Sequence, residues 1–95
     1  MIIINDKLLA EFRQKERCER CWSRNGIQPH HLFSRGLGGA WRFDIRVNLI
    51  ALCLVCHTSV HNGCIDREEL LAIVAKREKT TPQAIQEQIW HLRRS

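Results

Sequence analysis

Four cysteines in two Cys-x-x-Cys pairs constrain this chain more than any other feature of its sequence. The pairs are Cys18-x-x-Cys21 and Cys53-x-x-Cys56. The two-residue spacer lets both thiolates of a pair turn toward one ion at about 2.3 Å, and four thiolates leave no position open for substrate. The sequence therefore predicts a structural Zn²⁺ held by these four residues. Cys64 is left over, and we interpret it as a small buried residue or a free thiol, the alternative being that it replaces one of the four ligands.

A metal clamp meets a physical need in a chain of 95 residues. A domain of this size buries a modest share of its surface, so its apolar core supplies little stability on its own. We interpret residues 1–95 as a single domain in which the clamp closes a long loop. The apolar start Met1-Ile2-Ile3-Ile4 is too short for a signal peptide, and no apolar run is long enough to cross a membrane. We therefore expect a cytoplasmic protein, where thiols stay reduced.

Capping residues and apolar spacing predict an α+β chain. Helices are expected at 6–17, from Cys53-Leu54 to about His61, after a cap at Asp66, and from Thr80 or Thr81 through about Arg93. Strands are expected at 27–33 and 48–54. The segment 34–40 carries three glycines and is expected to be irregular.

Four of the five histidines form two groups that can meet in space. His57 and His61 stand four positions apart, so on a helix both rings project from the same face. Cys56 and His57 are separated by about 100° around the helix axis, so one can face zinc while the other faces away. The pair His30-His31 lies on the preceding strand. The sequence thus predicts a second site on the other flank of this helix, against the alternative that each histidine is an ordinary core or surface residue.

Taken in order, these motifs resemble the HNH endonucleases, also called His-Me finger proteins, which have a ββα-metal fold. The matching positions lie within residues 18–61 and are Cys18-x-x-Cys21, His30-His31, Gly38-Gly39, Asn48-Leu49 and Leu52-Cys53-x-x-Cys56-His57-x-x-x-His61. The resemblance implies a small α+β domain of this fold with a structural Zn(Cys)₄ site. An N-terminal helix at 6–17 and two C-terminal helices at 66–93 would flank it.

The resemblance also implies a role for each matched polar position. His30, His57 and His61 match the ligands of a catalytic divalent ion, an all-imidazole set similar to that of the nuclease colicins. His31 matches the general base that activates water, and Asn48 matches the asparagine that braces the loop and orients the base. Imidazoles favour Mn²⁺, Ni²⁺ or Zn²⁺, whereas Mg²⁺ prefers oxygen and is expected to need a substrate phosphate to complete its shell.

The charge of the chain favours an anionic partner. Lysine and arginine number 15 against 10 acidic residues, which gives a net charge of +5; the alternative is a basic surface that only aids solubility. Arg35, Arg42 and Arg46 border the expected site, and we predict that they bind DNA phosphates, which positions the substrate without reading its sequence.

These inferences converge on an endonuclease that hydrolyses DNA phosphodiester bonds, either by nicking or by double-strand cleavage. Double-stranded DNA is the expected partner. By resemblance, compact members of this kind come from bacteriophage or mobile elements, and a homodimer or a protein partner for targeting is compatible with the sequence. The alternatives are a non-catalytic, zinc-stabilised DNA-binding module and a structural adaptor that binds protein through its C-terminal helices.

Overall fold

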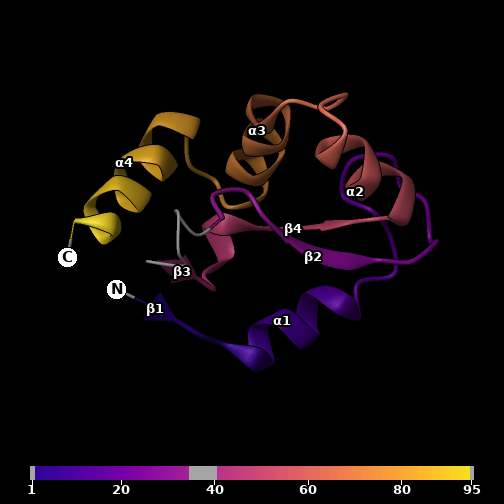
Figure 1. Ribbon diagram of the computed structural model, residues 1–95, viewed down its shortest axis with the longest axis horizontal. Coiled ribbons are helices and arrows are strands. Elements are labelled where there is room, and N and C mark those ends of the chain that lie inside the picture. The colour runs from indigo at the N-terminus through magenta and orange to yellow at the C-terminus, as the bar shows by residue number, and fades with distance from the viewer. Residues whose placement is uncertain (1, 35–40, 95) are drawn as a thin grey trace.

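The computed structural model describes residues 2–34 and 41–94 of this α+β protein (Figure 1). Its helices are α1 (Asp6–Arg13), α2 (Leu54–His61), α3 (Arg67–Arg77) and α4 (Pro82–Arg93). Its strands are β1 (Ile2–Ile3), β2 (Gln28–His31), β3 (Arg42–Phe43) and β4 (Leu49–Leu52). A 3-10 turn at Arg46–Asn48 leads into β4. None of the described helices is both long and apolar enough to cross a membrane.

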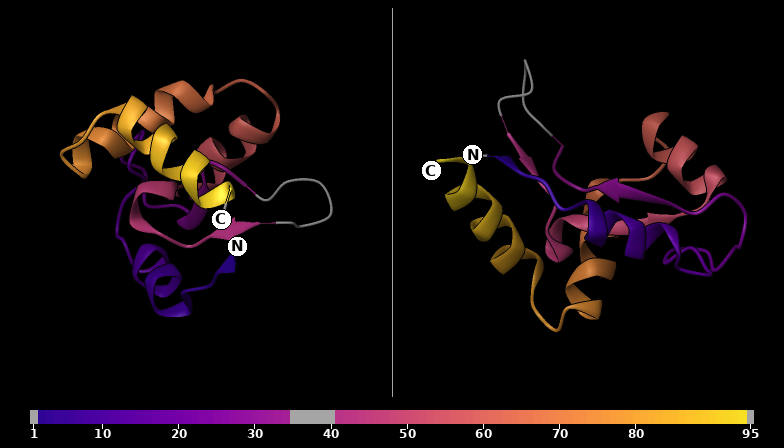
Figure 2. Two further views of the ribbon diagram at one scale, coloured as in Figure 1. Left: turned by 90° about the vertical axis from the view of Figure 1, so that its left-hand side faces the viewer. Right: turned by 90° about the horizontal axis from the view of Figure 1, so that it is seen from below.

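β2 and β4 form an antiparallel pair that separates two apolar cores. His30 lies opposite Ile50 in this pair, and His31 lies opposite Leu49. Because successive side chains of a strand face opposite sides, Ile50 joins the larger core under α2, α3 and α4, whereas Leu49 packs with Phe12 of α1. Figures 1 and 2 show α1 and α3 on opposite faces of the pair. All of β4 is buried, which explains why its sequence is a continuous apolar run.

α1 is shorter than the sequence predicts, since it ends at Arg13 rather than at 17. Its buried residues are Leu9 and Phe12, and no further apolar side chain follows until Cys18. A longer helix would therefore bury nothing more, and the chain instead turns to bring Cys18 toward α2.

A second sheet, formed by β1 and β3, is a feature that the sequence does not predict. The two strands pair in parallel, with Ile2 opposite Arg42 and Ile3 opposite Phe43. The backbone N–H of Asp44 continues the pairing by donating to the carbonyl oxygen of Ile3 at 2.9 Å. Strands of two residues show no periodicity, so only the tertiary structure defines them. The sheet places the N-terminal residues beside the segment that precedes β4.

α2 has the bounds that the sequence predicts, and both ends are explained by local chemistry. Cys53 caps its start, because the Cys53 sulfur accepts a hydrogen bond from the backbone N–H of Cys56 at 3.4 Å. After His61 the chain leaves the helix at Asn62, and Gly63 has a φ of +78°. Glycine adopts this conformation without the steric cost that a side chain imposes.

Candidate metal centre and active site

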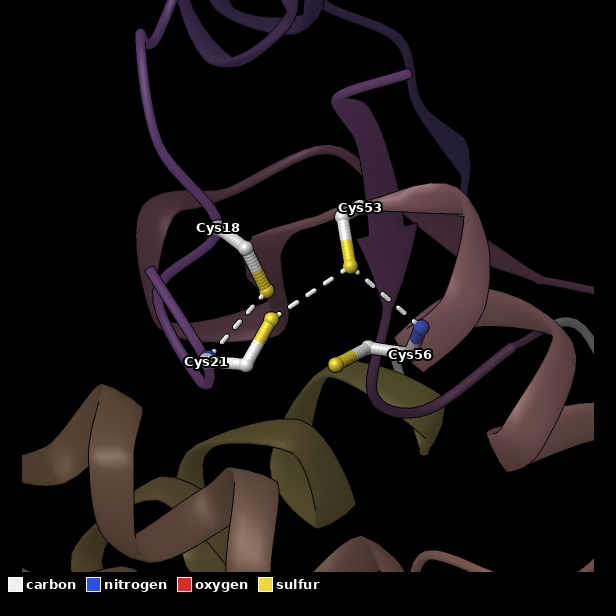
Figure 3. A group of neighbouring side chains, drawn as sticks. All are labelled: Cys18, Cys21, Cys53 and Cys56. Carbon is white, nitrogen blue, oxygen red and sulfur yellow. Dashed lines mark hydrogen bonds between the residues drawn. The ribbon is translucent and has the colours of Figure 1, made fainter. Parts of the chain in front are cut away.

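The four cysteines of the two Cys-x-x-Cys pairs converge on one point (Figure 3). Their sulfur atoms all lie within 4.8 Å of one another, and those of Cys21 and Cys53 are 3.5 Å apart. Four thiolates about 2.3 Å from a tetrahedral zinc ion would be about 3.8 Å apart, so the cluster has the size of such a site. The predicted Cys₄ metal-binding cluster is confirmed, and its donor set fits structural zinc.

Hydrogen-bond donors surround this cluster. The sulfur of Cys18 accepts from the backbone N–H groups of Arg20 at 3.4 Å and of Cys21 at 3.5 Å. Burial opposes ionisation of Cys18, but backbone N–H donors outweigh it and lower its pKa to about 7. Burial raises the pKa of Cys56 to about 12, so binding of a metal ion there must release a proton. Cys64 is exposed and is not part of the cluster, so it is a free thiol rather than a small buried residue or a replacement for one of the four ligands.

A cavity of about 460 Å³ brings together the four histidines that the sequence singles out. The Nε2 atoms of His57 and His61 are 3.2 Å apart on successive turns of α2. His30 of β2 stands edge-on to both, with its ring centroid 5.3 Å from that of His57 and 6.2 Å from that of His61. Since Cys56 belongs to the cysteine cluster, α2 presents one group of side chains to each site.

The surroundings of two of these rings, His30 and His57, favour the neutral imidazole. Burial is the main reason that the pKa of His30 falls to about 4, and repulsion from His57, His61 and His31 adds to the effect. The pKa of His57 is lowered by burial and by His61. A neutral imidazole keeps a lone pair for a metal ion, and three imidazole side chains facing one cavity form a donor set that fits a divalent transition metal.

His31 lines the same cavity, but its Nε2 atom points away toward a buried carboxylate. This atom lies 2.7 Å from Oδ1 of Asp44, a residue that is 1% exposed. Asp44 also accepts from the backbone N–H of Asn5 at 2.9 Å and from Nε and Nη2 of Arg42 at 3.0 and 2.9 Å. Burial opposes ionisation of Asp44, but the hydrogen bonds from Arg42, Asn5 and His31 outweigh it and lower its pKa to about 2.

The ionised carboxylate fixes the tautomer of the imidazole. A carboxylate without its proton can only accept hydrogen bonds, so Nε2 of His31 must carry the proton between it and Asp44. The lone pair of the neutral ring then resides on Nδ1. Asp44 therefore orients the ring of His31, a role that the family resemblance assigns to Asn48.

Asn48 is fully buried and braces the chain on either side of the site rather than the imidazole. Its Oδ1 accepts from the backbone N–H of Phe33 at 2.8 Å. Its Nδ2 donates to the carbonyl oxygens of Phe33 at 3.0 Å and of Phe43 at 2.9 Å. Both amide hydrogens are used in this way, so neither remains for His31. Asn48 thus holds the two chain segments together, as expected. The expected contact between Asn48 and His31 is absent, and Asp44 makes a contact with His31 instead.

The arginines expected to bind DNA have surroundings that the sequence does not reveal. Arg35 lies outside the described residues, as do Gly38 and Gly39. Arg42 forms its two hydrogen bonds with Asp44. Nη1 of Arg46 lies 2.7 Å from a carboxylate oxygen of Glu11, and its Nε lies 3.4 Å from one of Glu78. The charges of Arg42 and Arg46 are therefore already balanced by carboxylates.

Comparison with known proteins gives one match. A family model described as HNH endonuclease matches residues 18–63, a segment that holds the cysteine cluster, the four cavity histidines and Asp44. The curated proteins and the solved structures compared with the chain gave no match. Three observations fit the ββα-metal fold: the family match, the cysteine cluster, and the order β2, β4, α2 along the chain. They confirm the predicted fold class.

Proposed function

Because residues 18–63 of this chain belong to the HNH endonuclease family, we propose that it is a metal-dependent endonuclease that hydrolyses DNA phosphodiester bonds. The main support for the proposal is that one cavity is lined by His31 and by three further histidines, which are His30, His57 and His61. Hydrolysis of a phosphodiester requires water to lose a proton while negative charge builds on the leaving oxygen. A general base beside metal-binding imidazoles serves both needs.

His31 is the general base in this mechanism. With its Nε2–H directed at Asp44, Nδ1 accepts a proton from the attacking water. The water oxygen bonds to phosphorus as the bond to the 3′ oxygen breaks, which by family resemblance leaves a 5′-phosphate and a 3′-hydroxyl. The positive charge that His31 then carries is stabilised by the carboxylate of Asp44, as in other base–carboxylate pairs.

We assign the divalent ion to His30, His57 and His61, whose rings converge in the cavity. The chemistry that such an ion supplies is stabilisation of negative charge on the phosphate and on the 3′ leaving oxygen. Three imidazole nitrogens favour Mn²⁺, Ni²⁺ or Zn²⁺ over Mg²⁺. Asn48 holds Phe33 and Phe43 together, and so keeps β2 and the segment of Asp44 in register.

A plasmid-nicking assay tests the proposal. The wild-type protein is incubated with supercoiled DNA and Mn²⁺, Ni²⁺ or Mg²⁺ beside His31→Ala, His57→Ala and the control His91→Ala, whose site on α4 is outside the histidine cavity. Nicking by the wild type and the control, with loss of about 10²- to 10⁴-fold in His31→Ala, supports the enzyme. Circular dichroism and zinc content establish that the variants are folded.

Two outcomes would contradict the proposal. Equal nicking by wild type and His31→Ala would remove His31 from the mechanism. DNA binding by the wild type without nicking in any of the three metals would favour a non-catalytic, zinc-stabilised DNA-binding module, for which the net charge of +5 also provides a basis.

A further inference from the structure

We propose that Arg13 and Arg67 bind the DNA phosphates that flank the scissile bond. This inference rests on the proposed nuclease function and concerns how the substrate is held. Both residues lie outside the segment 18–63 that the family model matches, one on α1 and one on α3. The helices that precede and follow the matched segment would then supply the substrate contacts.

Arg67, the first residue of α3, lines the cavity that contains the four histidines. Its guanidinium carbon lies 4.5 Å from the centroid of the Phe33 ring. Stacking on an aromatic ring engages the flat face of a guanidinium and leaves its N–H edges free to donate. Within the described ranges no carboxylate forms a salt bridge with Arg67. The residue thus presents a fixed and unneutralised cation to the histidine cavity.

Arg13, the last residue of α1, lines a second cavity of about 300 Å³. The two cavities share Pro29, His31 and Ser34, so they adjoin each other at the proposed base. Arg13 also has no salt-bridge partner in the part of the chain that the structure describes. A second unneutralised cation therefore lines a cavity that His31 also lines.

The two arginines come from helices on opposite faces of the β2–β4 pair, because α1 and α3 cover its two sides (Figures 1 and 2). In the described parts of the chain, other arginines differ from them in being paired with carboxylates; these are Arg20, Arg42, Arg46 and Arg77. A DNA strand that places one phosphate at His31 has a further phosphate on either side. The guanidinium fork matches phosphate oxygens in bidentate fashion, so Arg13 and Arg67 suit those neighbouring groups.

The test measures binding separately from cleavage. Fluorescence anisotropy with a labelled DNA duplex compares Arg13→Ala, Arg67→Ala and the double variant, all in a His31→Ala background, over a range of salt concentrations. Arg24→Ala is the matched control, because Arg24 is exposed and lines neither cavity. A glutamine variant replaces any alanine variant that thermal unfolding shows to be misfolded.

Each lost phosphate contact should flatten the slope of log affinity against log salt by about 0.9 and weaken binding roughly tenfold at 0.1 M salt. The double variant should flatten the slope by about twice as much as either single variant, and Arg24→Ala should leave the slope unchanged. Affinities and slopes equal to those of the control would overturn the inference.

Nicking by the wild-type protein, measured in parallel, separates this inference from the proposed function. If the wild type nicks DNA while both arginine variants bind like the control, the phosphate contacts are refuted and the nuclease stands. If the wild type does not nick but the variants lose affinity and slope, the phosphate contacts are supported and hydrolysis is refuted.

Discussion

Nε2 of His31 lies 2.7 Å from Oδ1 of Asp44, and this contact links β2 to the small sheet built from the N-terminus. The backbone N–H of Asp44 bonds to Ile3, and its carboxylate accepts from the N–H of Asn5. Residues that precede the family segment therefore help to fix the orientation of the proposed base. The consequence is that the orientation of His31 depends on a carboxylate that was not among the positions found to resemble the HNH endonucleases.

Replacing Asp44 with asparagine should lower kcat by about 10²- to 10⁴-fold, in the range expected for loss of general-base catalysis. The amide of Asn can donate to Nε2 of His31, which would move the ring proton to Nδ1 and remove the lone pair that faces water. Steady-state nicking rates measure the effect, and KM should change little. Glu87→Gln, a carboxylate-to-amide change on α4, is the control. Full activity in Asp44→Asn would show that the tautomer is set by another group.

The same substitution should also reveal the contribution of Asp44 to stability. The folded-state pKa of Asp44 is lowered from 3.8 to about 2, so its ionised form stabilises the fold above pH 3.8 and loses this effect as the pH falls toward 2. The shift corresponds to about 2 kcal/mol at pH 7. Urea unfolding should therefore show Asp44→Asn less stable than wild type by about this amount, with the difference vanishing near pH 2. A difference that does not change with pH would contradict the assignment.

The helices were predictable because their signals are local. Asp66 and Thr81 stand directly before helix starts, and the hydroxyl of Thr81 accepts from the backbone N–H of Ala84. Gly63 follows the end of α2 in the left-handed conformation that glycine favours. β1 and β3 were not predictable, since a pairing between residues 2–3 and 42–43 depends on contacts across nearly half the chain. A two-residue strand is too short to show the alternation of apolar and polar residues from which a strand is predicted.

The residues that meet at the site were predictable to the extent that their spacing is fixed by one element. His57 and His61 share a helix face, and the Cys-x-x-Cys spacing brings thiolates together. Asp44 gave no such signal, because an acidic residue between Phe43 and Ile45 looks like an exposed loop position until the structure shows it buried. The pairing of Arg46 with Glu11 and Glu78 was hidden for the same reason, because its partners lie far away in the sequence, on α1 and directly after α3.

Removal of zinc should unfold the protein. The cysteine cluster ties the segment before β2 to the start of α2, and structural zinc sites in small domains supply roughly 10–16 kcal/mol, comparable to the whole stability of a domain. Cys21→Ser should reduce bound zinc below one ion per chain, measured by native mass spectrometry, and should lower the melting temperature. Cys64→Ser is the matched control, because Cys64 is exposed and outside the cluster. Loss of zinc from Cys64→Ser instead would move the ligand assignment to that residue.

Asn48→Ala should destabilise the fold by roughly 3 kcal/mol, because it removes the side-chain partner of three backbone groups, one of them in a buried hydrogen bond and two in part-buried ones. These groups are the N–H and carbonyl of Phe33 and the carbonyl of Phe43, which bracket the segment leading from β2 to Asp44. Asn48→Asp should be no better, since its second oxygen would face two carbonyl oxygens. The control is Asn62→Ala at the exposed end of α2, where a change within about 0.5 kcal/mol is expected. If urea unfolding gave the two alanine variants equal stability, Asn48 would not be the brace of this site, and its place in the family motif would have to be explained by direct contact with substrate.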